Sequence, residues 1–151
     1  MSSHREQIIA AAAGKVAEPI LGAAFAKPRG ATTAGIGGGL IVDAIGGKKV
    51  SDQTEGAKAA GIILGNPGAV AVTSTSLVTM QVKVSMMGQI KEITEILSTV
   101  PLAEVDSLEV KRMGAAGVME ISAHGNAFKL EGKAGDMKEF ASAFEQAKAT
   151  A

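Results

Sequence analysis

Three short segments between residues 101 and 132 alternate apolar and polar residues, and this pattern constrains the fold more than any other feature of the chain. Side chains of a β-strand point to opposite faces in turn, so each segment has one apolar and one polar face. The apolar pairs are Leu108 and Val110, Met119 and Ile121, and Phe128 and Leu130. The pattern therefore predicts an antiparallel sheet that must cover one of its faces.

The segment after these strands has the spacing of an amphipathic helix. Asp136 and Glu139 form a capping-box pattern, which predicts that the helix starts there. Apolar residues then recur at helical intervals, and they are Met137, Phe140, Ala141, Phe144 and Ala147. We expect this helix to cover the apolar face of the sheet.

Two more strands are expected upstream, at residues 69–73 and 78–84, with a turn at Ser74-Thr75 between them. Residues 89–100 fit a helix or a strand, and we expect a strand because β-branched residues are enriched there. Pro101 ends this element, since proline lacks the backbone N–H and restricts the residue before it. The predicted fold class is α+β.

Several features of residues 69–147 occur together: Val72-Thr73 beside a strand, the phrase from Val100 to Lys111, the loop from Gly114 to Gly117, and the closing helix. With them, this region resembles the pleckstrin-homology-like (PH-like) superfamily, in particular its small bacterial members and the related GRAM-type domains. The family often has Asn or Asp and then Lys or Arg after the Val-Thr pair, where this chain has serine and threonine. The resemblance implies a strongly bent antiparallel sheet or small barrel plugged by a C-terminal helix. It also implies binding of lipid or peptide, or self-association, rather than catalysis.

The chain is expected to have three parts: an N-terminal helical segment at residues 1–29, a glycine-rich segment at 30–68, and the PH-like domain at 69–151. In the first part, Ser3 and Glu6 form a capping-box pattern. A thin apolar stripe follows at helical spacing, formed by Ile9, Ala12, Val16 and Ile20. We expect Pro19 to kink this helix or start a new one, and the chain to leave it at residues 27–30.

The glycine-rich segment allows two structures, a helical hairpin with closely packed backbones or a flexible linker. A membrane-spanning helix is not expected, because Asp43 interrupts the apolar run well short of the roughly 20 residues that a span needs. Apolar residues left exposed here would form a patch that associates with a second copy or a protein partner. The expected patch comprises Gly35, Gly39, Leu40, Ile41, Gly61, Ile62 and Gly65.

The residue types argue against catalysis and against nucleic acid. The chain has no cysteine, tryptophan or tyrosine and a formal net charge of zero, so thiol chemistry, base stacking and general attraction to phosphate are not expected. In a nucleotide-binding P-loop, Ser or Thr would stand in place of Lys49. The two histidines, His4 and His124, lack metal-ligand spacing. We expect no catalytic residue, metal or cofactor, and we expect His124 to be a solvated residue of a hairpin turn at residues 124–126.

The predicted function is a non-enzymatic binding or self-assembly module. The alternative is a peripheral membrane adaptor that binds anionic lipid head groups, and its predicted contacts are Lys48, Lys49, Lys111 and Arg112. A cytoplasmic location is expected, because the polar residues at the N-terminus do not form a secretory signal.

Overall fold

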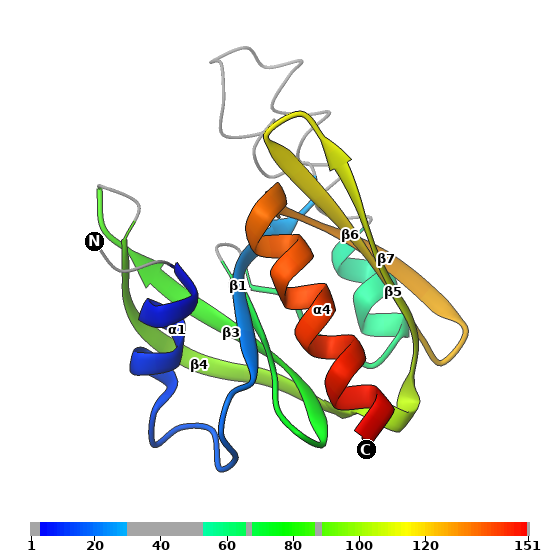
Figure 1. The fold of residues 1–151 in the computed structure, drawn as a ribbon, viewed down its shortest axis with the longest axis horizontal. Coiled ribbons are helices and arrows are strands. Elements are labelled where there is room, and N and C mark those ends of the chain that lie inside the picture. The colour runs from blue at the N-terminus through cyan, green and yellow to red at the C-terminus, as the bar shows by residue number, and fades with distance from the viewer. Residues whose placement is uncertain (1–3, 30–52, 66–67, 87–88, 151) are drawn as a thin grey trace.

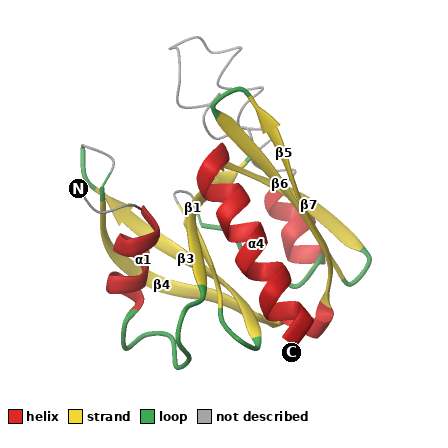
Figure 2. Cartoon of the chain, viewed as in Figure 1, coloured by secondary structure: helices red, strands yellow, loops and turns green. Residues whose placement is uncertain are grey.

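The computed structural model describes residues 4–29, 53–65, 68–86 and 89–150, and its fold is α+β (Figure 1, Figure 2). A seven-stranded antiparallel sheet is flanked by helices α1 (His4–Ala12) and α4 (Ala134–Thr150). The strands are β1 (Gly22–Pro28), β2 (Gly68–Val72), β3 (Ser76–Val84), β4 (Ile90–Pro101), β5 (Val105–Met113), β6 (Ala116–Ala123) and β7 (Asn126–Lys133). Their order in space is β4-β3-β2-β1-β7-β6-β5.

Strand β1 joins the two halves of the sheet. It pairs with β2 along Gly22–Ala26 and with β7 at Lys27 and Pro28. Figure 1 shows that the strands of one half run at a large angle to those of the other half. The outermost strands, β4 and β5, do not pair with each other, so the sheet is strongly bent but not closed into a barrel.

The N-terminal part is helical only as far as Ala12, so the prediction of a helical segment over residues 1–29 is wrong from Ala13 onward, and residues 22–28 form strand β1 instead. The physical reason is that the first residues of β1 have small side chains, which fit in the middle of a sheet that is covered on both faces. Ala23 and Ala24 are both buried, on opposite faces of a strand that lies inside the sheet. At Gly22 an added Cβ would come within 2.6 Å of the Ala143 Cβ on α4. Small residues thus let helices approach both faces of this strand.

Two clusters of buried side chains lie on opposite faces of the sheet. Helix α1 places Ile8 and Ala12 against one face, where they join a cluster with Val78, Met80 and Val82 of β3. Helix α4 covers the other face, and its buried residues there are Met137, Phe140, Phe144 and Ala147. Because both faces of its half of the sheet are covered, all residues of β2 are buried.

Most of the expected elements are confirmed. Strands β5, β6 and β7 coincide with the three alternating segments, and α4 covers their apolar face as predicted. Residues 90–101 form strand β4, as expected for this ambiguous stretch. Helix α4, however, begins at Ala134, so Asp136 lies in its first turn instead of capping it. A carboxylate in the first turn still interacts favourably with the helix dipole.

Residues 53–65, from the glycine-rich segment, pack into the core next to α4. Residues 53–59 are helical, and the helix ends in a Schellman motif. In this motif the Ile62 N–H donates to the Ala57 carbonyl at 2.8 Å and the Gly61 N–H to the Lys58 carbonyl at 3.0 Å. Gly61 adopts a φ of +84°, which glycine accommodates without strain. The helix therefore stops before Gly65, and residues 53–65 pack into the core instead of forming a flexible linker; the other arm of the predicted hairpin lies outside the described residues.

Candidate functional site

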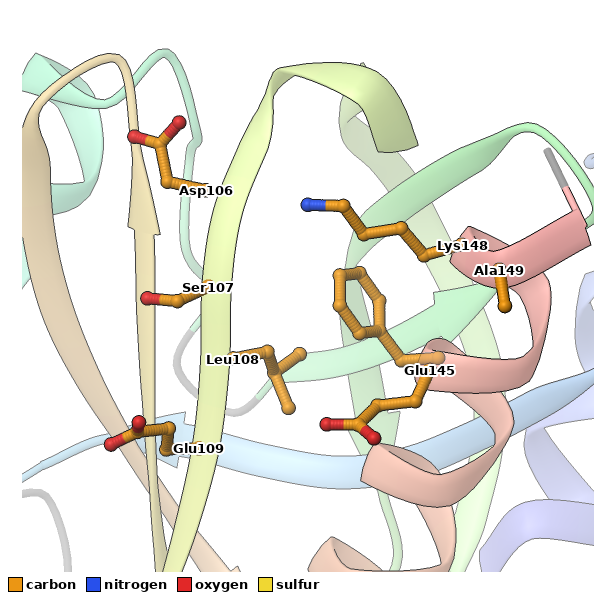
Figure 3. A pocket seen from close by; sticks show the side chains of 8 residues that line it. Asp106, Ser107, Leu108, Glu109, Glu145, Lys148 and Ala149 are labelled. Carbon is orange, nitrogen blue, oxygen red and sulfur yellow. The ribbon is translucent and has the colours of Figure 1, made fainter.

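A groove runs between strand β5 and helix α4. At one end, 420 Å³ of space is lined by Asp106 to Glu109 of the strand and by Phe144, Glu145, Lys148 and Ala149 of the helix (Figure 3). At the other end, 470 Å³ is lined by Leu108 to Lys111 and by Lys138, Ala141, Ser142 and Glu145. The two spaces share Leu108, Glu109 and Glu145, so they form one continuous groove.

The floor of the groove is apolar, and its rim is charged. Figure 3 shows the side chains of Leu108, Glu145 and Lys148 between strand and helix, whereas Ser107 and Glu109 point away from α4. Leu108 and Phe144 are 6% and 3% exposed, so they form a solid apolar floor. A ligand in this groove would meet apolar surface beneath it and charged groups at its rim.

Strand β5 is an edge strand, so one side of its backbone is open. It pairs with β6 from Val105 to Met113, and the order of the sheet places no strand on its other side within the described residues. The Lys148 ammonium donates to the Val105 carbonyl at one end of this edge, next to a register shift between Val105 and Ser107. The remaining edge, from Leu108 to Arg112, can accept another strand.

Charges along the groove alternate in sign. On the strand, Glu109 and Lys111 are exposed, and on the helix, Lys138 and Glu145 are exposed. Strand and helix run in opposite directions along the groove, so Lys111 lies at the end with Lys138. Glu109 and Glu145 line its middle, but only the Glu145 side chain points into the groove, since that of Glu109 points away from α4.

A second arrangement of polar groups holds the end of the helix at 53–59 against the turn between β6 and β7. The His124 Nδ1 atom lies 2.8 Å from the Ala60 carbonyl oxygen, and its Nε2 atom lies 2.6 Å from a Glu104 carboxylate oxygen. The Asn126 side-chain amide donates to the Ala59 carbonyl at 3.1 Å. We call this set, His124, Glu104, Asn126 and the two carbonyls, the histidine clasp.

The prediction that His124 is a solvated residue of a hairpin turn is confirmed, since its side chain is 45% exposed, and the histidine clasp adds contacts that the sequence did not indicate. The turn forms where expected, with positive φ at His124 (+52°) and Gly125 (+78°), but both ring nitrogens of His124 have partners. The hydrogen bond to the Ala60 carbonyl, and then the one to Glu104, raise the pKa of His124 above its ordinary value. The Ala59 and Ala60 carbonyls lie at the end of a helix, where a cation is favoured.

The predicted phosphate contacts Lys111 and Arg112 lie together on the β5–β7 part of the sheet, in a pocket of 200 Å³. The structure adds Arg29 and Lys129 to them, two residues that sequence reasoning missed. Glu109 and Glu120 line the same pocket, so cations and carboxylates are mixed there. Lys48 and Lys49, also predicted, lie outside the described residues.

The predicted association patch is only partly described, and of its described members Ile62 and Gly65 are buried while Gly61 is exposed. Ile62 is fully buried in the core of the chain itself, so the prediction that it forms an exposed patch is wrong. Gly61 lies against the His124 ring, and Gly65 lies against the backbone of β3. The physical reason is that the chain turns at Gly61 and brings Ile62 under the sheet. Gly35, Gly39, Leu40 and Ile41 lie outside the described residues.

Comparison with known proteins returns no matching family model and no curated protein of significant similarity. Within the described parts of the chain, no helix has both the length and the apolar character required to cross a membrane. The same residues contain no group of three or more His, Asp or Glu side chains arranged to hold a metal ion. The class of the protein therefore rests on its fold, an open α+β sheet with a groove at its β5 edge.

Proposed function

We propose that this chain is a non-enzymatic binding or self-assembly module built on a PH-like scaffold, and that it binds an extended segment by strand addition to β5. The observation that carries the proposal is the open edge of β5 beside a groove with an apolar floor. In strand addition, backbone hydrogen bonds supply affinity and neighbouring pockets select side chains.

The architecture supports a binding scaffold of this kind. A strongly bent antiparallel sheet with a C-terminal helix packed against one face is what the resemblance to PH-like proteins implied. The groove lies between two rigid elements, so a bound segment would meet a surface that is already in place.

A peripheral membrane adaptor is the second candidate, and the pocket of Arg29, Lys111, Arg112 and Lys129 favours it. Two carboxylates in the same pocket weaken its attraction for anionic head groups. In the pairing of β5, β6 and β7, Glu109 stands opposite Glu120 and Glu120 opposite Lys129. We therefore rank this function below strand addition.

The test is selection of peptides from a displayed random library on the full chain, followed by hydrogen exchange of the complex. We expect a selected peptide to slow exchange of β5 amides and to lose affinity in Ser142→Arg, because Ser142 lines the groove. Gln146→Arg is the matched control, an exposed position on the same helix that lines neither end of the groove. Protection confined to β4, or equal affinity for both variants, would contradict the proposal. Flotation with phosphatidylserine vesicles at low salt tests the second candidate, which fails if the protein stays unbound.

A further inference from the structure

We infer that the occupant of the β5–α4 groove is a second copy of this chain, with the two β5 strands paired antiparallel about a twofold axis at Val110. The inference rests on the proposed function, since it identifies the partner in strand addition. Its basis is the order of charges along the groove. Strand β5 and helix α4 each have opposite charges on either side of their centre, so a twofold axis there places each charge opposite a charge of the other sign on the partner.

The strand sets the register. In an antiparallel pair related by a twofold axis normal to the sheet, residues at equal distances before and after the axis stand opposite each other and share a face. With the axis at Val110, Glu109 stands opposite the partner's Lys111, and Lys111 stands opposite the partner's Glu109. Val110 then contacts the partner's Val110, and β-branched residues pack well in such cross-strand pairs.

The neighbouring registers are less favourable. An axis at Glu109 places two glutamates opposite each other, and an axis at Lys111 does the same with two lysines; like charges directly opposite are destabilising. An axis at Leu108 extends the pairing into Asp106, where the register shift between Val105 and Ser107 distorts the strand. Only the register at Val110 gives two opposite-charge pairs and keeps the ladder within the regular part of β5.

Helix α4 has the same symmetry at the same level of the groove. Its groove-lining residues are Lys138, Ala141, Ser142 and Glu145, which follow one helical stripe with opposite charges at its ends and small residues at its centre. Lys138 lies at the end of the groove that contains Lys111, and Glu145 lies beside Leu108 and Glu109. The twofold axis at Val110 therefore also turns Lys138 towards the partner's Glu145.

The first experiment exchanges the charges. In sedimentation velocity over a range of concentrations, we expect Lys111→Glu or Glu109→Lys to weaken self-association at least about tenfold, because each opposes like charges across the axis. The double variant Glu109→Lys/Lys111→Glu restores the opposite pairs and should return to within about threefold of the wild-type association constant. Lys91→Glu is the matched control, an exposed lysine on the other edge strand, β4.

The second experiment locates the axis. The chain has no cysteine, so Val110→Cys provides a single thiol. Cβ atoms directly opposite each other in an antiparallel pair are about 5 Å apart, near the reach of a disulfide. We expect mild oxidation to link two copies of Val110→Cys efficiently, and to link copies of Thr94→Cys, an exposed position on β4, much less.

The outcomes separate this inference from the proposed function. A chain that stays monomeric while a selected peptide still protects β5 would overturn the inference and leave strand addition standing. A monomer that also selects no peptide would overturn both. A dimer that neither weakens in Lys111→Glu nor crosslinks in Val110→Cys assembles through another surface and overturns the inference alone.

Discussion

Replacing Ile62 and Ile63 separately tests whether residues 53–65 belong to the folded core. Ile62 is completely buried in the cluster beneath α4, whereas its neighbour Ile63 is 45% exposed. The Ile62→Ala change removes the side chain beyond Cβ. At about 0.8 kcal/mol per buried carbon, and with a cavity left behind, the loss comes to roughly 3 kcal/mol in the free energy of unfolding.

Ile63→Ala removes the same atoms from a position that is open to solvent, so no enclosed cavity forms and the loss should be roughly 1 kcal/mol. The backbone anchors of Ile63 stay intact, because its N–H donates to the Ser98 hydroxyl and its carbonyl accepts from the Thr79 hydroxyl.

Urea denaturation of the full chain measures both losses. With an m-value of roughly 2 kcal/mol/M, Ile62→Ala should lower the midpoint by about 1.5 M and Ile63→Ala by about 0.5 M, with the m-value unchanged. Equal and small shifts would refute the reasoning, because they would mean that residues 53–65 contribute no buried contact and act as a linker.

Two further predictions concern the histidine clasp and the packing of α4. Because the pKa of His124 is raised in the folded state, the folded chain binds the proton more tightly than the unfolded chain. Protonated His124 therefore stabilises the fold fully below about pH 6.5, and this stabilisation is lost as the pH rises through the folded pKa. His124→Asn, which tolerates the positive φ, should flatten this fall in unfolding free energy above about pH 6.5. An unchanged slope, or an NMR titration with a lowered His124 pKa, would contradict it. Gly132→Ala should destabilise by about 1–3 kcal/mol, because its Cβ would lie 2.7 Å from both the Met137 Cε and the Phe25 carbonyl oxygen. Gly135→Ala, with open space around it, is the control and should be neutral or slightly stabilising in thermal denaturation.

The strands and the closing helix were predictable because their signals are local. The alternation in residues 105–133 and the helical spacing after Ala134 each depend on neighbours within a few positions, and the structure confirms both. The strand at residues 22–28 was missed for the opposite reason. Its alanines have no strand pattern of their own, and they form β1 because two strands and two helices surround them.

The functional groups were harder to predict, since their partners are distant in the chain. His124 was recognised as a turn residue, but its contacts come from Ala60 and Glu104, which no sequence spacing connects to it. Ile62 was expected on a surface, and only the turn at Gly61 shows why it is buried. Lys111 and Arg112 were identified as cations, while Arg29 and Lys129 beside them came only from the pairing of strands.

By itself, the sequence determined the α+β class, the three closing strands and the amphipathic helix, because backbone periodicity and turn chemistry act over a few residues. The tertiary structure decided which strand is the edge. The opposite charges of Glu109 and Lys111 around Val110 are present in the sequence, but the proposed pairing with a second copy depends on β5 being the last strand of the sheet and bordering α4. An edge is a property of how all the strands pair, and strand pairing depends on contacts between segments that are far apart in the chain.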